Sequence, residues 1–509
     1  MKFTEVRMNK LESNIYADIY QGISNNFYEV LKSPLSEKET SFADFLIKEI
    51  ARGSLFKRTF EGLKDDFNDP FYDEIVSYIQ VNQFNEKLPS KKDFAILSGA
   101  MEVILIKVKF VKDKKFFAEY VLYHSIGLKQ LSFFSLDPDL EELMINSPDS
   151  IFVFHKKYGM CKTNVVIEQK SLVDLIQRIA ITLGKDFSGK NALLDARLPD
   201  GSRVNATLSE LSPTGATLTV RKFASIPLTI LDLIESNTIT SEAAAFLWLM
   251  VDGLGNYPRN ILIAGGTTSG KTTFLNIMSN FIRLSERVVS IEDTIELSLL
   301  GRDNWVALEA RSSVSEQVSM DALLRNAMRM RPDRIIVGEV RGSEALTLFT
   351  AMDTGHQGCL GTIHANNARE TIVKLQERPL SVPRAMLPLL DLVVVLQRRF
   401  SKDKGMQRHI TQIVELSRMD DKVLFGTLFE FDDKVGVLMR TELAGAVIEE
   451  IAQHNSLTRL DLMKEIKTRQ KILDWMLKQG VRKPMEVLEI IESYYYSPDK
   501  VLSTMSDVE

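Results

Sequence analysis

One short segment of the sequence combines the residue types that bind phosphate groups. The apolar run Asn260–Ala264 leads into Gly265-Gly-Thr-Thr-Ser-Gly-Lys-Thr272, which fits the pattern G-x-x-x-x-G-K-[ST] between a strand and a helix expected over Thr273–Phe281. The glycines allow backbone N–H groups to face phosphate oxygens, and the start of a helix adds a favourable dipole. We therefore predict a nucleoside triphosphate site formed by Gly265, Gly266, Thr267, Thr268, Ser269, Gly270, Lys271, Thr272 and Thr273.

Lys271 and Thr272 have the most specific expected roles in this segment. The ammonium of Lys271 is expected to reach the β- and γ-phosphates, and the hydroxyl of Thr272 to bind Mg²⁺. A chance match remains the alternative, but eight positions agree with the pattern in the strand–loop–helix context that it requires.

Two further apolar runs end in carboxylates, which a nucleotide site needs for its metal ion and its attacking water. Arg334-Ile-Ile-Val-Gly-Glu339 predicts a strand whose Glu339 binds Mg²⁺ or positions the water. Arg287–Ile291 predicts a second strand, followed by Glu292-Asp-Thr-Ile-Glu296. Carboxylates this close repel one another unless a cation shares the site, although a solvated acidic turn is the alternative. Either Glu292 or Glu296 is a candidate general base.

A third segment, Gly355–His364, contains His356, Cys359 and His364. This spacing fits no common zinc pattern, and no further cysteine lies nearby to complete a tetrahedral site. The small apolar residues predict instead a buried strand over Cys359–Ile363, with a histidine at each end. Because a neutral imidazole can hydrogen-bond a γ-phosphate or relay a proton, His356 and His364 are catalytic candidates.

The elements that must position these residues predict an α/β chain of several domains. Residues 1–130 are predicted to be a mostly helical extension without recognisable chemistry, in which Met101–Phe110 could be either strand or helix. Residues 131–225 combine short strands and turns with a helix over Ser171–Leu183, which indicates a small α/β domain. After a linker at 226–230, residues 231–509 alternate strands and helices, as parallel sheets do, and end in helices.

Composition excludes several other classes of protein. The 509 residues are 45% hydrophobic and 26% charged, as in folded proteins of more than one domain. The net charge of −5 gives no sign of nucleic-acid binding. Two cysteines cannot form a disulfide framework and are typical of a reducing intracellular setting. The start of the chain does not read as a secretory signal, and no apolar run approaches the ~20 residues that span a bilayer.

In their order and spacing these motifs resemble the secretion ATPase superfamily, the motors of type II/IV secretion systems and type IV pili. The family's Walker A loop, acidic Asp box, Walker B strand and His box correspond here to Gly265–Thr272, Glu292–Glu296, Ile335–Glu339 and Gly355–His364. The resemblance spans roughly Leu136–Gln397. It implies a RecA-like motor domain, a homohexamer, ATP and Mg²⁺ as cofactors, and Thr272 and Glu339 as the metal ligands.

The resemblance extends to the smaller domain. Arg197-Leu-Pro-Asp-Gly-Ser-Arg203 and Arg221-Lys-Phe223 are similar to stretches whose arginines reach nucleotide across a subunit boundary in this family. Arg197, Arg203 and Arg221 are therefore candidates for contacts in trans, and plain surface charge is the alternative. A guanidinium suits this role because it binds phosphate oxygens bidentately.

Departures from the bacterial members favour a particular branch of the superfamily. Two cysteines rule out the four-cysteine zinc insertion, and Asn366–Ile372 does not match the motif of the retraction motors. The chain looks most like the archaellum motor ATPase. This resemblance implies that hydrolysis moves the domains, powers filament assembly and rotation, and acts on a polytopic membrane platform with accessory cytoplasmic motor proteins. It also implies a cytoplasmic protein held peripherally at the inner face of the cell membrane, without direct nucleic-acid binding.

Other functions remain open from the sequence. An ATPase of an archaeal type IV pilus or of a type II/IV secretion system is the first alternative. A RecA-like nucleic-acid translocase and a non-hydrolysing nucleotide switch are more distant ones, which DNA-stimulated turnover and absence of turnover would reveal.

Overall fold

The computed structural model describes residues 10–14, 16–22, 25–30, 35–52, 70–84, 86–106, 108–189, 191–198, 201–222, 228–312, 317–401, 405–419, 422–443 and 445–506. The chain divides into two compact units, unit 1 (Met1–Ser225) and unit 2 (Ile226–Glu509). No helix in the described part combines the length and apolar character needed to cross a membrane. The predicted linker falls at this division, and its residues 226–227 lie outside the described residues.

Unit 2 is built on a nine-stranded sheet in the order β12-β11-β15-β16-β10-β17-β18-β19-β20. The strands from β12 to β17 in this order run parallel, and the remaining ones are antiparallel. Their bounds are β10 (Ile261–Gly265), β11 (Val288–Glu292), β12 (Trp305–Glu309), β15 (Arg334–Val340), β16 (Leu360–Ile363), β17 (Leu392–Ser401), β18 (Gly405–Met419), β19 (Lys422–Asp432) and β20 (Val437–Arg440). A further short pair, β13 (Arg311–Ser312) and β14 (Gln317–Val318), stands apart from the sheet.

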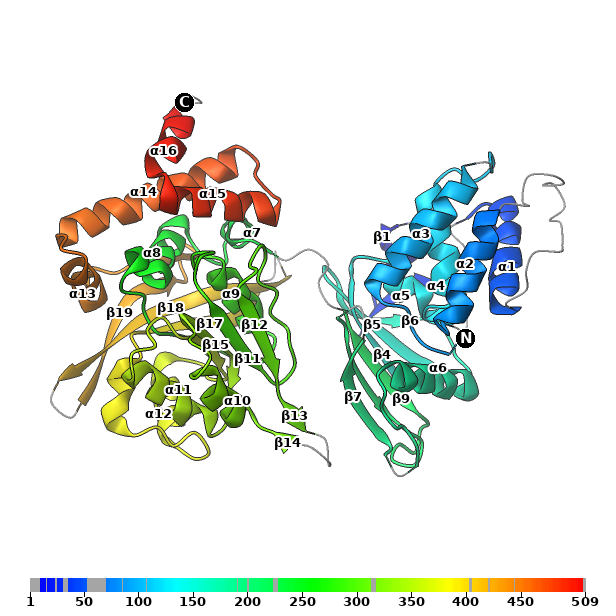
Figure 1. Ribbon diagram of the computed structural model, residues 1–509, viewed down its shortest axis with the longest axis horizontal. Helices are drawn as coiled ribbons and strands as arrows, with labels where there is room; N and C mark the ends of the chain where they lie inside the picture. Colours follow the sequence, from blue (N-terminus) through cyan, green and yellow to red (C-terminus); the bar gives the residue numbers. More distant parts are fainter. Residues whose placement is uncertain are drawn as a thin grey trace. The chain divides into compact units, whose positions relative to one another are not determined.

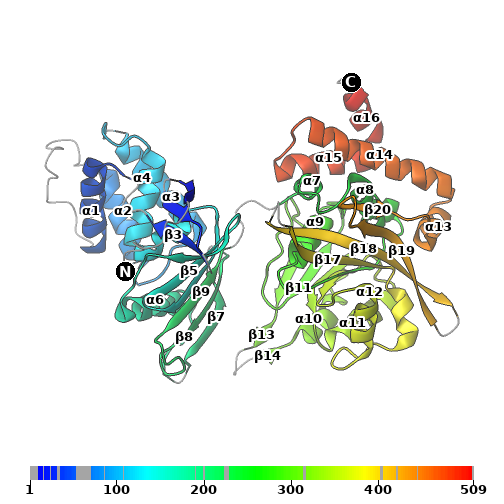
Figure 2. The same ribbon diagram turned by 180° about the vertical axis from the view of Figure 1, so that it is seen from behind.

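Helices cover both faces of the parallel strands, as the continuous apolar character of these strands requires. In β10, Ile261 and Ile263 pack into one core, whereas Leu262 and Ala264 pack into a second core on the opposite face. The first core is formed with α7 (Ile230–Glu235), α8 (Ser241–Asp252), α9 (Lys271–Ser279), α13 (Ala446–His454), α14 (Arg459–Lys478), α15 (Pro484–Tyr496) and α16 (Pro498–Ser506). The second core is formed with α10 (Met320–Ala327), α11 (Glu344–Asp353) and α12 (Ala368–Gln376), which lie together in both views (Figures 1 and 2).

Unit 1 contains a second nine-stranded sheet, in the order β1-β2-β3-β6-β5-β4-β9-β8-β7. Its strand pairs are antiparallel except for β3 with β6. The bounds are β1 (Lys10–Ser13), β2 (Ala17–Tyr20), β3 (Asn26–Val30), β4 (Leu140–Ser147), β5 (Ser150–His155), β6 (Gly159–Thr163), β7 (Leu193–Arg197), β8 (Arg203–Thr207) and β9 (Thr217–Arg221). Helix α6 (Gln169–Thr182) packs on one face, where Leu172 and Ile176 join Leu143, Val204 and Val220 in one core.

The remaining helices of unit 1 form a separate core of their own. They are α1 (Glu37–Arg52), α2 (Pro70–Val81), α3 (Lys91–Leu105) and α4 (Lys114–Ser125). The short α5 (Ser132–Leu136) packs mainly into the core of the sheet, through Phe133 and Phe134. The stretch that could be strand or helix is helical as far as Leu105, at the end of α3. The α/β class is confirmed, but the sequence reading missed β1, β2 and β3. Because these strands lie in the sheet with β4–β9, the sheet does not divide at residue 130.

A buried carboxylate joins these N-terminal strands to the rest of the sheet. Asp137 accepts hydrogen bonds from the hydroxyl of Tyr28 and from the side-chain amide of Asn14, the latter at 3.2 Å. Tyr28 and Asp137 are both fully buried. Burial and the neighbouring Asp137 raise the pKa of Tyr28 far above its usual range, so its hydroxyl remains a donor.

Candidate nucleotide-binding site

The predicted phosphate loop, Gly265–Thr272, connects β10 to α9 at the carboxyl edge of the parallel strands. A Cβ on Gly265 would lie 2.6 Å from the carbonyl oxygen of Leu396 and would also meet the Ser269 hydroxyl, so only glycine fits there. Gly270 has φ of 95°, which glycine adopts without strain. Helix α9 begins at Lys271, so its first N–H groups face the loop.

The ammonium of Lys271 lies among opposite charges at this edge. Its Nζ donates to the carbonyl oxygen of Gly266 at 3.0 Å. Burial lowers the pKa of Lys271, whereas the charges of Glu339 and Glu296 act to raise it. The structure therefore brings the lysine and two of the predicted acids into one electrostatic environment, with Thr272 and Thr273 next on the first turn of α9.

The acidic residues lie at the ends of β11 and β15, which are adjacent and parallel. We call Glu292, Asp293, Glu296 and Glu339 the acidic flank. The guanidinium of Arg341 forms an ion pair with Asp293 and a longer one, of 3.4 Å from Nε to Oε2, with Glu339. Arg341 thus connects the two acidic segments, a contact that sequence reasoning did not specify.

Glu292 and Glu296 differ in what they bind. Glu292 is 2% exposed, and its Oε2 accepts the backbone N–H groups of Glu296 at 2.7 Å and of Leu297 at 3.0 Å. A Cβ on Gly338 would lie 2.7 Å from the Cγ of Glu292, so this carboxylate side chain fits only beside glycine. Glu292 therefore fixes the turn that carries Glu296. The choice of general base between Glu292 and Glu296 stays a prediction.

The two histidines lie at opposite ends of β16. His364 follows the strand at the carboxyl edge, and its Nε2 is 3.1 Å from the hydroxyl oxygen of Thr267 in the phosphate loop. His356 precedes the strand, and β16 pairs in parallel with β10, so roughly 13 Å of strand separates it from this edge. The two histidines thus lie at opposite ends of the strand, as the sequence predicts. The structure does not bring His356 to the phosphate loop of its own chain, and its catalytic role stays a prediction.

Two arginines on the other side of β10 also contact the phosphate loop. Arg398 on β17 donates from Nη1 to the Thr268 hydroxyl at 2.9 Å, and Arg408 on β18 donates from Nε to the Thr268 carbonyl oxygen at 3.1 Å. Sequence reasoning missed both residues. Arg398 follows the buried apolar run Leu392–Leu396 closely, so the signal that identified Glu339 was present here as well.

The arginines of unit 1 form a single row across three strands. Arg197 pairs with Arg203, and Arg203 pairs with Arg221, as directly opposed residues of β7, β8 and β9. Their neighbours Val204 and Val220 are buried on the face covered by α6, so this arginine row lies on the opposite face. Arg221 also forms an ion pair of 3.5 Å with Glu142.

Thr272 and Glu339 fit the predicted role of Mg²⁺ ligands. Among the described residues, no group of three or more His, Cys, Asp or Glu side chains is arranged to hold a metal ion. A magnesium ion at a phosphate site usually keeps several waters and takes only one or two protein ligands together with phosphate oxygens. One hydroxyl and one carboxylate at the carboxyl edge are therefore a sufficient donor set.

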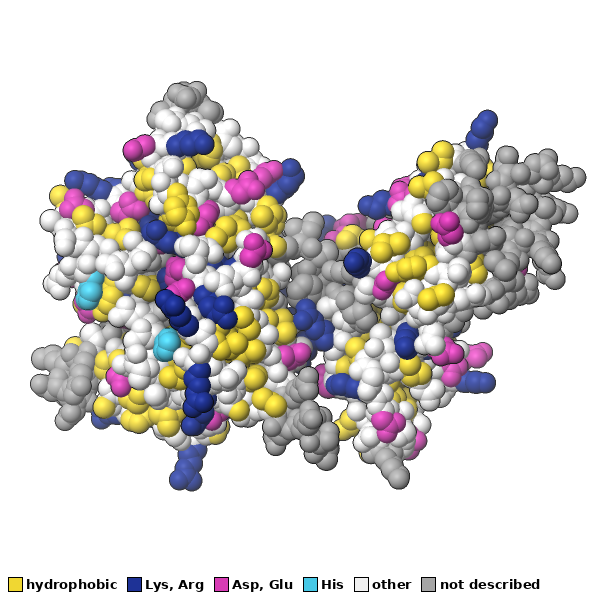
Figure 3. Space-filling view, in the orientation of Figure 1, with side chains coloured by type: hydrophobic (Ala, Val, Ile, Leu, Met, Phe, Trp, Pro, Cys, Tyr) yellow, Lys and Arg dark blue, Asp and Glu magenta, His cyan; other side chains and the backbone are white. Residues whose placement is uncertain are grey.

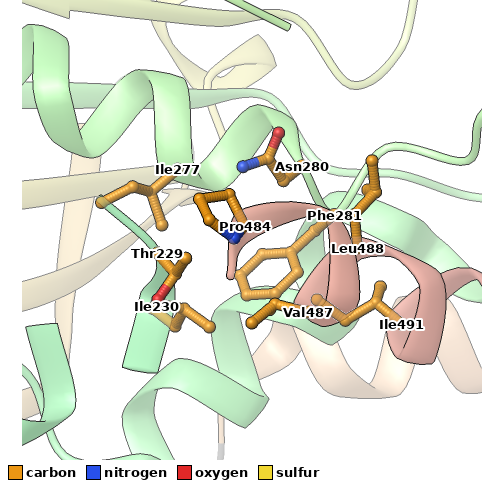
Figure 4. A pocket seen from close by; sticks show the side chains of 9 residues that line it. All are labelled: Thr229, Ile230, Ile277, Asn280, Phe281, Pro484, Val487, Leu488 and Ile491. Carbon is orange, nitrogen blue, oxygen red and sulfur yellow. The ribbon is translucent and has the colours of Figure 1, made fainter. Parts of the chain in front are cut away.

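A small pocket lies at the other end of α9 from the phosphate loop. Figure 4 shows the side chains that line it, from the start of α7, the end of α9 and α15. It encloses about 10 Å³, room for about one water molecule, and its lining is mostly apolar, with Thr229 and Asn280 as its polar residues. This pocket holds none of the predicted site residues.

Comparison with known proteins identifies the family. Residues 131–419, more than half of the chain, match the family described as Type II/IV secretion system protein. The chain belongs to this family. The parallel sheet of unit 2, with its phosphate loop at the carboxyl edge, is the RecA-like domain of this secretion family.

Two relatives in Methanocaldococcus jannaschii and one solved structure illustrate the similarity. The uncharacterized protein MJ0781 is 47% identical over 251 residues, which cover 48% of this chain and 34% of MJ0781. The uncharacterized protein MJ0900 is 33% identical over 399 residues, 76% of this chain and 71% of MJ0900. The crystal structure of the Brucella suis VirB11 ATPase from a type IV secretion system is 25% identical and covers 57% of this chain and 93% of VirB11, with a TM-score of 0.29. The matched region thus covers about a third of the length of MJ0781.

Proposed function

We propose that this member of the secretion family is a Mg²⁺-dependent ATPase and works as the motor of a filament or secretion machine. The observation that carries the proposal is the convergence at one sheet edge of the phosphate loop, the ammonium of Lys271 and the carboxylates of Glu296 and Glu339. Phosphoryl transfer to water requires mainly positioning and charge stabilisation, and these groups supply both.

Each group has a distinct task in this proposal. Lys271 neutralises charge on the β- and γ-phosphates, and Thr272 and Glu339 hold the metal ion, which would polarise the phosphate oxygens. Glu296 orients the attacking water and accepts its proton, while Glu292 fixes the turn that presents Glu296. His364, beside Thr267, hydrogen-bonds the γ-phosphate end of the nucleotide.

The arginine row of Arg197, Arg203 and Arg221 suggests that the complete site includes a second subunit. Directly opposed arginines on neighbouring strands place their guanidinium groups side by side, an arrangement suited to binding several phosphate oxygens. Glu142 offsets part of the charge at one end. We propose that the protein forms a homohexamer, in which phosphates bound at the carboxyl edge of the unit 2 sheet of one subunit contact the arginine row of a neighbouring subunit.

The cellular role that we favour is the archaellum motor, with assembly and rotation of the filament driven by movement between the two units. The motor would act from the cytoplasmic side on a polytopic membrane platform protein, together with accessory motor proteins. An archaeal type IV pilus or type II/IV secretion ATPase is the alternative. The 47% and 33% identity to two uncharacterized proteins of Methanocaldococcus jannaschii, and the absence of a four-cysteine insertion, support an archaeal branch of the family, which includes both roles.

A nucleic-acid translocase is less well supported. Such proteins carry a concentrated basic surface. On the face of unit 2 visible in Figure 3, acidic and basic side chains are interspersed. Turnover stimulated by anionic lipid vesicles, and not by DNA, is expected for a motor at the membrane. Stimulation by DNA, with binding that weakens steeply as salt rises, would favour the translocase instead.

The ATPase proposal is tested by Lys271→Ala, measured as steady-state phosphate release. We expect turnover to fall at least about 100-fold, because the variant loses a cation that stabilises the transferred phosphoryl group. Lys478→Ala, at the exposed end of α14, is the matched control and should keep full activity. Equal turnover in Lys271→Ala and wild type would refute the site assignment, and a wild type that binds ATP without turnover would indicate a nucleotide switch.

A further inference from the structure

The hairpin of β17 and β18 extends beyond the end of the strand that carries the phosphate loop. β10 and β17 pair in parallel until Gly265 is opposite Leu396, where β10 ends. β17 continues to Ser401 and returns as β18, so that Arg398 and Arg408 are directly opposed in the extended part. These two residues, the arginine pair, therefore stand beside the phosphate loop on the side away from the acidic flank, because β15 and β17 lie on opposite sides of β10.

Both side chains of the arginine pair turn toward the loop. They donate to the two oxygens of the same residue, Thr268, whose φ is 60°. The Cδ of Arg408 lies 3.3 Å from the position that a Cβ on Gly270 would take, so its side chain runs over the glycine that precedes α9. The arginine pair thus reaches the phosphate loop at its middle and at its end.

The charges of the arginine pair are not balanced by the described part of the protein. Both residues are exposed, and neither forms an ion pair with a described carboxylate, although their like charges oppose each other across two strands. The neighbouring Arg399 differs: it pairs with Asp433 and stacks on Phe431, with 4.8 Å between its guanidinium and the ring centre. One cation of this hairpin is therefore satisfied within the fold, while the arginine pair faces the loop.

We propose that Arg398 and Arg408 bind the phosphate chain of the nucleotide from the side opposite Glu339. This proposal rests on the proposed nucleotide site and adds to it a second set of cations supplied by the same chain. The planar guanidinium donates to phosphate oxygens through two N–H groups at once, and it stays charged at any physiological pH. The site is then divided into a side of carboxylates, which suits a metal ion, and a side of guanidinium groups, which suits the anion itself.

The arginine pair also explains how the loop is held. The contacts to Thr268 keep a residue with positive φ in place, and the same guanidinium groups remain close enough to exchange one loop acceptor for a phosphate oxygen. If the arginine pair only clamped the loop, its effect on nucleotide binding would depend on its contacts to Thr268. If it binds the phosphates directly, its effect on nucleotide binding would persist when the contact to the Thr268 side chain is removed. These two roles can be separated by substitution.

The test is equilibrium titration of the full chain with ATP and with inorganic tripolyphosphate, which lacks ribose and base. Arg398→Ala and Arg408→Ala are each expected to weaken binding of both ligands about tenfold, the effect of losing one charge-assisted contact. Arg399→Ala, the matched control on the same strand, should bind like wild type. Thr268→Ala removes the hydroxyl acceptor of Arg398 but leaves the guanidinium free to bind phosphate, so it should weaken binding less than Arg398→Ala does. Arg398→Lys, which keeps the charge with less disturbance of the hairpin, should lie between wild type and Arg398→Ala.

Three results would overturn the proposal while leaving the nucleotide site intact. The first is wild-type affinity in both alanine variants. The second is weaker ATP binding with unchanged tripolyphosphate binding, which would assign the arginine pair to the ribose or base. The third is equal loss in Thr268→Ala and Arg398→Ala, which would make the arginine pair a clamp on the loop. Failure of the wild type itself to bind ATP would instead refute the proposed function.

Discussion

In unit 2 the candidate groups lie at an edge of the sheet, whereas in unit 1 they lie on a face. The difference follows from strand direction and from coverage. Parallel strands place all their carboxyl ends at one edge, and helices cover both faces of the parallel strands in unit 2, so loops at that edge are the available positions. The antiparallel strands β7, β8 and β9 have α6 on one face only, so charged side chains extend from the other.

This comparison explains why the two arrangements suit different tasks. Groups at the edge come from different strand ends and can surround a nucleotide, which is what metal binding and attack by water require. A row of arginines across a face presents several neighbouring positive charges to an anionic group outside the unit. The edge is therefore expected to carry the chemistry, and the face to complete the site of a neighbouring subunit.

The largest expected effect comes from the edge. Glu339→Gln removes the charge that would bind the metal and position the water, so phosphate release should fall about 100-fold or more while ATP binding is retained. Glu377→Gln, an exposed residue at the end of α12, is the control. If Glu339→Gln and Glu377→Gln hydrolysed ATP equally fast, the edge would not be the catalytic region.

Substitutions in the arginine row on the face of unit 1 should lower turnover less than substitutions at the edge of unit 2. Each arginine row is expected to act on the site of a neighbouring subunit. Arg221→Ala is expected to lower turnover about tenfold, because Arg197 and Arg203 remain in the row and each phosphate contact contributes modestly. Lys162→Ala on β6 is the control, since this residue lies on the same sheet.

Mixing variants sharpens this prediction. Arg221→Ala and Lys271→Ala subunits, mixed, should recover part of the activity, because some sites combine an intact edge with an intact face. Glu339→Gln mixed with Lys271→Ala should recover none, since every edge is then defective. Recovery in neither mixture would place the arginine row outside the active site.

The sequence predicted the edge far better than it predicted the face. β10, β11 and β15 are continuous apolar runs that end in glycine or carboxylate, so both the strands and their chemistry could be inferred locally. The register between strands could not. Only the parallel pairing of β16 with β10 shows which of the two histidines, expected at opposite ends of the strand, meets the phosphate loop. For the same reason, the opposition of Arg398 to Arg408 was not visible in the sequence, although Arg398 itself follows an apolar run.

The fold of unit 1 was harder to predict because its sheet depends on contacts between residues that are far apart in the sequence. β2 has only four residues, and β3 pairs in parallel with β6, more than 130 positions along the chain. Short strands of this kind have a weak local pattern, so residues 1–130 were predicted from their helices alone. The three arginines were found through resemblance to the family. Their alignment in one row is a property of the sheet.

The smallest expected effect concerns the stability of unit 1 alone, and it tests whether the two units are independent. Tyr28→Phe removes the hydroxyl that donates to buried Asp137, which should cost about 2 kcal/mol because the acceptor is a buried carboxylate. Tyr20→Phe, whose hydroxyl makes only a 3.4 Å contact to Asp18, is the control and should change stability by less than about 0.5 kcal/mol.

The tryptophans allow this effect to be assigned to one unit. Trp248, Trp305 and Trp475, the three in the chain, are all in unit 2. In urea titrations, Tyr28→Phe should shift an early part of the circular dichroism transition to lower urea and leave the tryptophan fluorescence transition unchanged. If both signals shifted together, unfolding of the units would be coupled, and edge and face would belong to one cooperative structure. If neither shifted, the Tyr28–Asp137 contact would contribute nothing to unit 1, and its N-terminal strands would be held by apolar packing alone.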